Sequence, residues 1–349
     1  MTHKNKVVAV ALSGGIDSLV SGYLLKNQYK NIFGIHFING YENQNPDFSI
    51  IEKQLGFPVF CIDLSKEFEQ KIVHYFIDTY INGKTPNPCV RCNKEIKFGS
   101  LLDHALKMGA DYLATGHYAR IITQDNNSYL EKGNDPLKDQ TYFLAMLSEK
   151  QLSKIIFPLS EMTKNDVKKF AASNNLHALS KKESQDICFI NDNDFAQFIQ
   201  KKCDVTPKTG DIKDIDNNIV GRHQGLHKFT IGQRRGINCP AKEPYYVQHI
   251  DMKNNILKVC FKKNLLKSTL NFSYITWNES NNLQLSDEKM VIKDIITKIR
   301  YSHKGALSTL SLNKTSGELV FDEPQNAITP GQAAVFYKGS RVLGAGIIQ

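Results

Sequence analysis

A strand, a tight glycine turn and a helix within the first 25 residues constrain this chain more than any other feature. The run Val7–Val10 is apolar and β-branched, which predicts a buried parallel strand. Leu19–Leu25 has one apolar helical face. Between them stands Ser-Gly-Gly-Ile-Asp-Ser at 13–18. Because a helix then begins directly after a strand, free backbone N–H groups and the positive end of the helix dipole point at one spot, which favours phosphate binding.

The residue types in this turn predict a nucleotide site. Gly14 and Gly15 have no Cβ, so the backbone can come close to an anion. Ser13 and Ser18 add hydroxyl donors, and Asp17 is placed to hold the Mg²⁺ that accompanies a nucleotide. The Walker and dinucleotide fingerprints are both absent. An ordinary glycine-rich turn is the alternative, but the pattern resembles the PP-loop of ATP pyrophosphatases, which cleave ATP between the α- and β-phosphates to adenylate a substrate.

Strand and helix patterns alternate over residues 1–120, which predicts a parallel sheet with helices on both faces. In such sheets the ligand lies at the carboxyl ends of the strands. Ser13, Phe37 and Gly116 each follow or end an expected strand, so we expect them at one nucleotide pocket. The expected strands are 7–10, 32–37, 58–62 and 111–115, and the expected helices are 19–25, 48–55, 66–81, 94–108, 140–147 and 164–174, with a hairpin over 118–133 that turns at 126–127.

Composition places the chain among ordinary globular proteins, with 349 residues, 41% hydrophobic and 23% charged. No apolar run is long enough to cross a bilayer, and the N-terminus leads straight into the first strand, so we expect a cytoplasmic protein without membrane contact. Residues 1–200 carry 22 Lys+Arg and 22 Asp+Glu, whereas residues 201–349 carry 22 and 13, which accounts for the whole net charge of +9. This asymmetry suggests a polyanionic partner for the second half, with a solvated basic surface as the alternative.

Seven cysteines, an odd number in a long chain, do not suggest a disulfide framework. Cys89 and Cys92 follow two prolines, Pro86 and Pro88, which predict an extended loop and no helix until after Cys92. Cys92 would then open the helix 94–108 beside Arg91 and Lys94, where its thiol pKa would be lowered. Half a zinc site is the alternative, but no second pair at finger spacing is present.

Cys188 is the second candidate thiol, because Lys181 and Lys182 precede it. Cys61 lies in an expected strand, which suggests a core position.

Beyond about residue 205, short alternating runs and frequent Gly, Asn and Pro predict small β-domains. The basic and glycine-rich stretch 221–236 is suited to letting phosphates approach the backbone.

The chain as a whole resembles the tRNA-specific 2-thiouridylases, bacterial enzymes that replace the C2 oxygen of a wobble uridine with sulfur. The resemblance spans almost the whole chain. Its matching stretches are 13–18, 85–98, 114–120, 138–144, 183–190, 229–236, 299–301 and 329–337.

The residues and the resemblance together predict an α/β protein with an N-terminal doubly wound parallel sheet of PP-loop, Rossmann-like type. A small β-rich domain and a C-terminal β-barrel would follow. We expect an ATP-binding catalytic domain at 1–200, the central domain at 201–262, and a tRNA-contacting barrel at 263–349.

The resemblance also implies a mechanism. ATP, with Mg²⁺, would adenylate the uridine C2 oxygen. A sulfur-relay protein or cysteine desulfurase would deliver a persulfide to Cys188. Cys92, the nucleophilic or resolving thiol, would then leave a Cys92–Cys188 disulfide to be reduced at each turnover. The resemblance implies no resident metal or cluster.

The implied site residues fall into three groups. The residues for ATP are Ala11, Leu12, Ser13, Gly14, Gly15, Ile16, Asp17, Ser18, Phe37 and Gly116. The flipped-out target base would lie against Asn87, Pro88 and Cys89, where relatives with an acidic residue in place of Cys89 use it as the base. The residues for tRNA are His117, Lys138, Asp139, Gln140, Arg300, Tyr301 and Gln332.

Two other classes of function remain open at this point. One is a PP-loop ligase that adenylates a small molecule, and the other is a non-enzymatic RNA-binding protein with a relic nucleotide fold. The ligase would not need Cys92 and Cys188, nor a basic second half. The RNA-binding protein would not release pyrophosphate.

Overall fold

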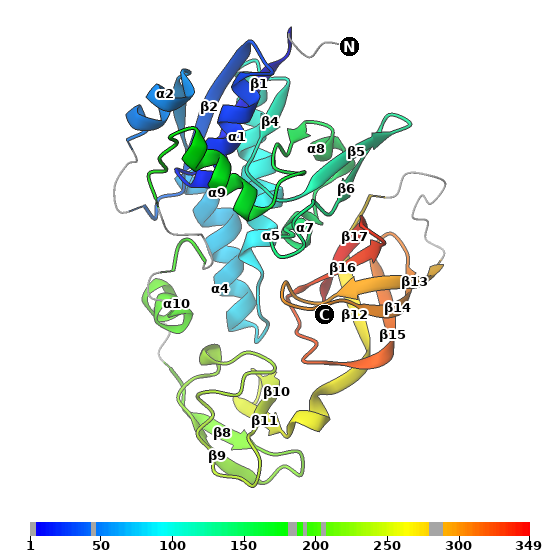
Figure 1. Cartoon of the computed structure of the whole chain (residues 1–349). Helices are drawn as coiled ribbons and strands as arrows, with labels where there is room; N and C mark the ends of the chain where they lie inside the picture. The colour runs from blue at the N-terminus through cyan, green and yellow to red at the C-terminus, as the bar shows by residue number, and fades with distance from the viewer. Residues whose placement is uncertain (1–4, 43–46, 181–186, 191–193, 204–206, 279–288) are drawn as a thin grey trace.

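The N-terminal part of the computed structural model is a five-stranded parallel sheet in the order β3-β2-β1-β4-β7 (Figure 1). The structure describes residues 5–42, 47–180, 187–190, 194–203, 207–278 and 289–349. The strands are β1 (Val7–Ala11), β2 (Asn31–Ile38), β3 (Val59–Asp63), β4 (Tyr112–Ala114) and β7 (Ile155–Ile156). All four neighbouring pairs run parallel, so the expected parallel sheet is confirmed.

Strand β1 lies at the centre of the sheet because both of its faces are apolar. Val8 and Val10 pack into one hydrophobic core and Ala9 into another, and all three are fully buried. Helices α1 (Ile16–Lys26), α2 (Ser49–Leu55) and α9 (Lys164–Ser173) cover the first face. The doubly wound arrangement is therefore confirmed.

Two long helices cover the other face, and each contains a π-helical stretch. The first consists of α3 (Ser65–Phe68), η2 (Glu69–Val73) and α4 (His74–Ile81). The second consists of α5 (Pro88–Cys92), η3 (Asn93–Leu101) and α6 (Leu102–Lys107). π-Helical stretches are rare in proteins overall, but many of those known lie at functional sites.

The second long helix begins at Pro88, so the prediction that the prolines delay it until after Cys92 is wrong. Proline is tolerated at the first helical position, because its missing N–H has no intrahelical acceptor there. Asn87 caps the helix: its Oδ1 accepts a hydrogen bond from the Val90 amide at 3.2 Å.

Smaller elements complete this part of the chain. In the hairpin of β5 (Arg120–Gln124) and β6 (Asn127–Glu131), the turn lies at Asp125–Asn126, one residue before the expected position, with φ of 51° and 63°. Helices α7 (Thr141–Leu144) and α8 (Glu149–Leu152) replace the single helix expected over 140–147. The expected helix at 164–174 is confirmed. Helix α10 (Phe195–Cys203) is not among the helices expected from the sequence.

The central part is a small four-stranded sheet in the order β10-β11-β8-β9. Its strands are β8 (Gly210–Lys213), β9 (Ile219–His223), β10 (Tyr246–Asp251) and β11 (Ile256–Cys260), with a 3-10 turn η5 (Leu226–Lys228). Val247, Leu257 and Val259 form the fully buried centre of its core.

The C-terminal part is a closed six-stranded barrel, as expected. Its strands are β12 (Leu266–Trp277), β13 (Met290–Lys298), β14 (Ala306–Leu312), β15 (Ser316–Asn326), β16 (Ala333–Lys338) and β17 (Arg341–Ile348), preceded by η6 (Lys262–Leu265). Pairing of β12 with β17 closes the ring. Arg341 in β17 also pairs with Glu131 in β6, so the N-terminal hairpin extends the barrel sheet.

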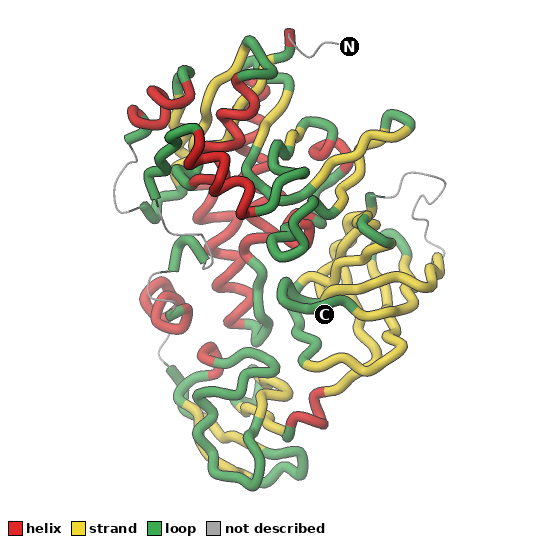
Figure 2. Tube along the Cα trace, viewed as in Figure 1, coloured by secondary structure: helices red, strands yellow, loops and turns green. Residues whose placement is uncertain are grey.

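Helices are concentrated in the N-terminal part and strands in the C-terminal part (Figure 2). Among the residues described, no helix is both long enough and apolar enough to cross a membrane.

Candidate functional site

The turn at 13–18 forms a closed cradle at the carboxyl end of β1. The Ser13 amide donates to Ser18 Oγ at 3.2 Å, and Ser18 Oγ donates to the Gly15 carbonyl at 2.9 Å. Gly14 adopts φ +80°, which favours glycine. Gly15 is the N-cap of α1 and makes no side-chain cap bond. The first N–H groups of α1 therefore remain available to an anion.

The loop after β4 lies directly against this cradle. A Cβ on Gly116 would come within 2.8 Å of the Asp17 carbonyl carbon and the Ser18 nitrogen. At the end of β2, the ring nitrogen Nδ1 of His36 lies 2.7 Å from the Leu12 carbonyl oxygen. The three stretches that end in Ser13, Phe37 and Gly116 thus lie together at the carboxyl ends of the strands. This is the switch point of the sheet, where β1 neighbours both β2 and β4.

Asp17 already has a cationic partner within the protein. Lys164 Nζ lies 2.7 Å from both Oδ1 and Oδ2 of Asp17, and the Tyr118 hydroxyl donates to Oδ1 at 2.7 Å. Within the described ranges, no group of three or more His, Cys, Asp or Glu side chains is arranged to hold a metal ion. Both Asp17 oxygens are thus engaged by Lys164, and the Mg²⁺ predicted to accompany ATP at Asp17 stays a prediction.

Three cysteines approach one another near the start of α5. Cys89 is exposed in the first turn of the helix, Cys92 is buried one turn later, and Cys188 is exposed. Asn39 Nδ2, just beyond β2, lies 3.9 Å from Cys188 Sγ. Ionisation of Cys89 or Cys188 would raise the pKa of Cys92, and Cys89 acts likewise on Cys188. The structure thus brings together the thiols that the sequence placed about a hundred residues apart.

All three thiols are protonated at neutral pH. Loss of water around the sulfur raises the pKa of buried Cys92 to about 12 and that of Cys188 to about 11, and it also raises the pKa of Cys89. Cys89 and Cys188 keep an exposed surface, but surrounding protein atoms replace most of the water near their thiols. The prediction of a lowered pKa for Cys92 is therefore wrong, because burial outweighs the nearby helix N-terminus and cations. All seven cysteines are free thiols here, so the Cys92–Cys188 disulfide stays a prediction. Cys61 is exposed, which corrects its expected core position.

The cation that acts on these thiols is Lys97, which sequence reasoning missed. Its charge lowers the pKa of all three thiols against the effect of burial. The expected cations are engaged elsewhere: Arg91 pairs with Glu95 at 3.1 Å, and Lys94 donates to Thr276 at 3.2 Å. Lys97 follows Cys92 by one π-helical turn, and that spacing could not be read as one face from a purely α-helical pattern.

Aromatic packing anchors the segment that carries Cys188. Phe189 packs edge-on against Phe68 and Phe76, with ring centroids 5.7 Å and 5.3 Å away. Lys181 and Lys182, the expected neighbours of Cys188, lie outside the described residues.

The barrel holds the segment that precedes the predicted target-base residues. The Thr85 amide donates to the Pro330 carbonyl at 2.8 Å. Gln332 Nε2 donates to the carbonyls of Thr85 at 3.1 Å and Pro86 at 3.0 Å. A Cβ on Gly331 would lie 2.6 Å from the Thr85 oxygen, so the two backbones are in close contact. The barrel therefore positions Asn87, Pro88 and Cys89, a contribution that sequence reasoning missed.

The predicted tRNA residues serve several structural roles. His117 packs between Phe98 and Phe157, and burial lowers its pKa well below the usual value, so its ring is neutral. Gln140 Oε1 accepts a hydrogen bond from the Tyr118 amide at 2.9 Å. Gln332 instead bonds the Thr85–Pro86 segment, as described above.

Tyr301 lies near two other residues of this prediction. Its ring lies against Phe143 with centroids 4.6 Å apart, and it is 40% exposed. Burial is the main reason why the pKa of Tyr301 is raised. The charges of Asp139 and Lys138 also affect this pKa, so these two side chains lie near the Tyr301 ring. Arg300 donates to the Asn326 carbonyl at 3.1 Å. Tyr301, Lys138 and Asp139 therefore form one partly exposed surface.

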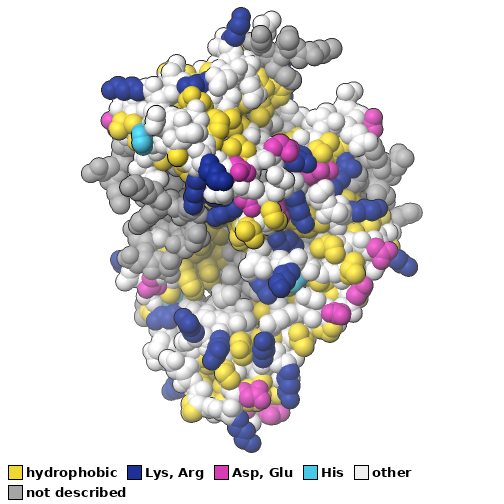
Figure 3. Space-filling model, in the orientation of Figure 1, with side chains coloured by type: hydrophobic (Ala, Val, Ile, Leu, Met, Phe, Trp, Pro, Cys, Tyr) yellow, Lys and Arg dark blue, Asp and Glu magenta, His cyan; other side chains and the backbone are white. Residues whose placement is uncertain are grey.

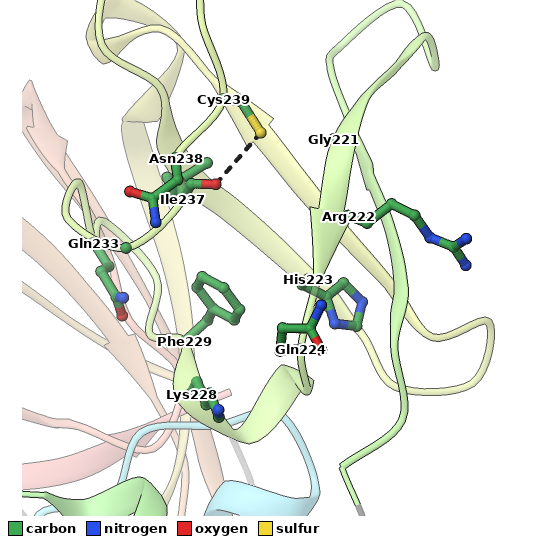
Figure 4. Close-up of a pocket in the computed structure, with 11 residues that line it drawn as sticks. Gly221, Arg222, His223, Gln224, Lys228, Phe229, Gln233, Ile237, Asn238 and Cys239 are labelled. Carbon is green, nitrogen blue, oxygen red and sulfur yellow. Dashed lines mark hydrogen bonds between the residues drawn. The ribbon is translucent and has the colours of Figure 1, made fainter.

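A separate recess of about 350 Å³ lies in the central domain (Figure 4). Most of its lining comes from the stretch 221–236, which the sequence predicts to admit phosphates, and Lys228 and Phe229 face it. None of the residues predicted for ATP, for the target base or for tRNA lines it. His223 and His227, expected in a phosphate-accessible loop, are buried, and burial lowers both pKa values, so neither supplies positive charge at neutral pH. On the face in Figure 3, Lys and Arg side chains are spread over all parts of the molecule.

Fold and site together define a class: an α/β protein with a PP-loop cradle, followed by a small β-domain and a closed barrel. Family models match in the same order. A tRNA methyl transferase HUP domain matches residues 6–192, a tRNA methyl transferase PRC-barrel domain matches 196–261, and an aminomethyltransferase beta-barrel domain matches 268–348.

Curated relatives narrow this class to one family. The tRNA-specific 2-thiouridylase MnmA of Desulfosudis oleivorans is 43% identical, over 99% of this chain and 95% of its own length. That of Syntrophotalea carbinolica is 40% identical over the full length of both chains. The chain belongs to the tRNA-specific 2-thiouridylase family. Among solved structures, the U34-tRNA thiolase NcsA of Methanococcus maripaludis aligns at a TM-score of 0.35 with 22% identity, over 58% of this chain and 65% of that one, and supports no conclusion.

Proposed function

We propose that this protein is an ATP-dependent tRNA-uridine 2-sulfurtransferase. It adenylates the C2 oxygen of a wobble uridine, replaces that oxygen with sulfur from a cysteine persulfide, and releases AMP and pyrophosphate. One observation carries the proposal. The thiol of Cys188 lies 3.9 Å from Asn39 Nδ2, just beyond the carboxyl end of β2, at the sheet edge that also carries the anion cradle.

The first half-reaction uses the cradle at 13–18. Backbone N–H groups at the start of α1 hold the phosphates of ATP, with Phe37 and Gly116 beside the adenosine. The uridine C2 oxygen attacks the α-phosphorus, the bond to the β-phosphate breaks, and pyrophosphate leaves. The C2 oxygen becomes part of an AMP leaving group.

The second half-reaction uses the thiols. The outer sulfur of a Cys188 persulfide attacks C2 and displaces AMP. The Cys92 thiol then attacks the Sγ atom of Cys188 and breaks its bond to the transferred sulfur. The transferred sulfur stays on the uridine, and Cys92 and Cys188 are joined in a disulfide. The transferred sulfur gains the two electrons that the two cysteine sulfurs lose, and an external thiol reductant restores them. Cys89 does not act as a base at neutral pH, because burial raises its pKa.

The partners follow from this chemistry. The substrate is a tRNA with a wobble uridine, held by the surface around Lys138, Asp139 and Tyr301 and by the basic second half of the chain. A persulfide-donating relay protein or cysteine desulfurase loads Cys188. The cytoplasm supplies both.

Mass spectrometry of nucleosides from tRNA, incubated with the protein, ATP, Mg²⁺ and a persulfide source, tests the proposal. We expect 2-thiouridine with the wild type, none with Cys188→Ser, and no more than one turnover with Cys92→Ser. Cys61→Ser is the matched control, because Cys61 is an exposed thiol on an edge strand. Full thiolation by Cys188→Ser would refute the role of Cys188 as the persulfide carrier. AMP formation that does not require tRNA would refute the assignment as a whole and favour a small-molecule ligase.

A further inference from the structure

A partly buried ion pair between Asp17 and Lys164 lies at the edge of the anion cradle. Lys164 Nζ is 2.7 Å from both carboxylate oxygens, and the side chains are 11% and 32% exposed for Lys164 and Asp17. The Tyr118 hydroxyl adds a bond to Oδ1 at 2.7 Å. Burying a lysine is costly unless its charge is compensated. We therefore looked for a function that a partly buried ion pair at this position would serve.

Local structure places this ammonium group firmly. Lys164 is the first residue of α9, and a capping box between Thr163 and Asp166 fixes where that helix begins. The Lys164 amide donates to Asp135 Oδ2 at 2.8 Å. Helices α1 and α9 pack side by side (Figure 1). Because Asp17 is in the first turn of α1, the ammonium lies beside the free N–H groups of the cradle.

The pair also solves an electrostatic problem of the cradle. An unpaired carboxylate in the first turn of α1 would repel the phosphates of ATP. Lys164 neutralises that carboxylate. An ammonium on a flexible four-carbon stem has three donors, so it can keep a bond to Asp17 and turn another donor to a phosphate oxygen.

We propose that Lys164 is a catalytic residue that contacts the phosphates of ATP, and that Asp17 is the positioning residue that holds its ammonium, rather than a metal ligand. This inference rests on the proposed function. As the uridine oxygen attacks the α-phosphorus and the bond to the β-phosphate breaks, the electron pair passes to pyrophosphate. The Lys164 ammonium offsets the negative charge that builds on that leaving group.

The test uses the full chain with Lys164→Met, Lys164→Arg and Asp17→Asn. Calorimetry measures binding of inorganic pyrophosphate, and a tRNA-dependent assay measures AMP formation. We expect Lys164→Met to lower pyrophosphate affinity about 10–100-fold and AMP formation about 10²–10³-fold. Lys164→Arg restores part of both, because it keeps the charge. Asp17→Asn keeps pyrophosphate affinity within about tenfold, because the ammonium remains.

Lys169→Met is the matched control, because Lys169 is an exposed lysine of the same helix. Melting temperature and tRNA binding verify that each variant is folded. Wild-type pyrophosphate affinity in Lys164→Met, with only a lowered melting temperature, would show that the pair is merely structural and would overturn the inference. A larger loss in Asp17→Asn than in Lys164→Met, restored by added Mg²⁺, would also overturn it. The pyrophosphate measurement decides the role of Lys164 even if the wild type forms no AMP, an outcome that counts against the proposed function alone.

Discussion

The raised thiol pKa values predict that Cys188 and Cys92 react slowly with alkylating reagents in the resting protein. With a pKa of about 11 against an ordinary value of 9.0, Cys188 has about one-hundredth of the usual thiolate at pH 8. With a pKa of about 12, Cys92 has about one-thousandth. A thiolate of higher pKa is intrinsically more nucleophilic, with a Brønsted slope of about 0.4–0.5. The net slowing is then about tenfold for Cys188 and about fortyfold for Cys92.

The assay is iodoacetamide labelling between pH 7 and pH 11, followed by peptide mass spectrometry. Each cysteine of the urea-unfolded chain serves as its own reference. Labelling of Cys188 in the folded protein should keep rising towards pH 11, whereas the unfolded reference levels off about two pH units earlier. Labelling of folded Cys188 at pH 7.5 that is as fast as in the unfolded chain would refute the reasoning.

Replacing the shared cation gives a second readout of the same prediction. Lys97→Met removes the charge that lowers the pKa of all three thiols, so Cys89 and Cys188 should label more slowly still. Lys107→Met is the control, because Lys107 is an exposed lysine at the far end of the same long helix. Equal labelling rates in the two variants would show that Lys97 does not act on the thiols.

Three further predictions follow from the close contacts and the charge. Gly15→Ala should weaken ATP binding but keep the wild-type melting temperature, because its Cβ would touch the protein only at Ser13 Oγ, 3.5 Å away. Gly116→Ala should lower both ATP affinity and melting temperature, because its Cβ would lie 2.8 Å from the α1 backbone. Equal calorimetric results for the two variants would contradict this. Gly331→Ala should destabilise the protein by about 1–3 kcal/mol in denaturant titrations and reduce thiolation, since its Cβ would lie 2.6 Å from the Thr85 oxygen at φ +92°; unchanged stability would contradict the barrel contact. Filter binding of tRNA should weaken steeply with salt, because the whole net charge of +9 comes from residues 201–349; an affinity that is flat from low to moderate salt would contradict it.

Local patterns predicted the parallel sheet and the cradle well, because both depend on short-range rules. An apolar run, a glycine pair and an amphipathic helix determine where β1 ends and where α1 begins. The same rules predict that Gly116 lies at the carboxyl end of its strand, beside the cradle. The same rules do not predict the start of α5, because they treat Pro88 as a helix breaker, whereas Asn87 caps the helix and allows Pro88 to be its first residue.

The environment of the thiols was beyond such local rules. The pKa of Cys92 depends on burial, which residues far apart in the chain create together. Lys97 became a neighbour only through a π-helical stretch, and such a stretch has no simple sequence signature. Lys164 was visible as the start of a helix, but its pairing with Asp17 joins positions that no local pattern connects.

The cradle is also joined through the backbone to Leu179 and Ser180. The Gly14 carbonyl accepts hydrogen bonds from the amides of Leu179 at 2.9 Å and Ser180 at 3.2 Å, only a few residues before Cys188 in the sequence. A Cβ on Gly14 would lie 3.4 Å from Leu179 Cβ, so the two chains are in contact there. Phosphates that bind the N–H groups of the same turn act on the turn to which Leu179 and Ser180 are attached. Under the proposed function, ATP that binds at this turn therefore acts directly on the backbone at Leu179 and Ser180.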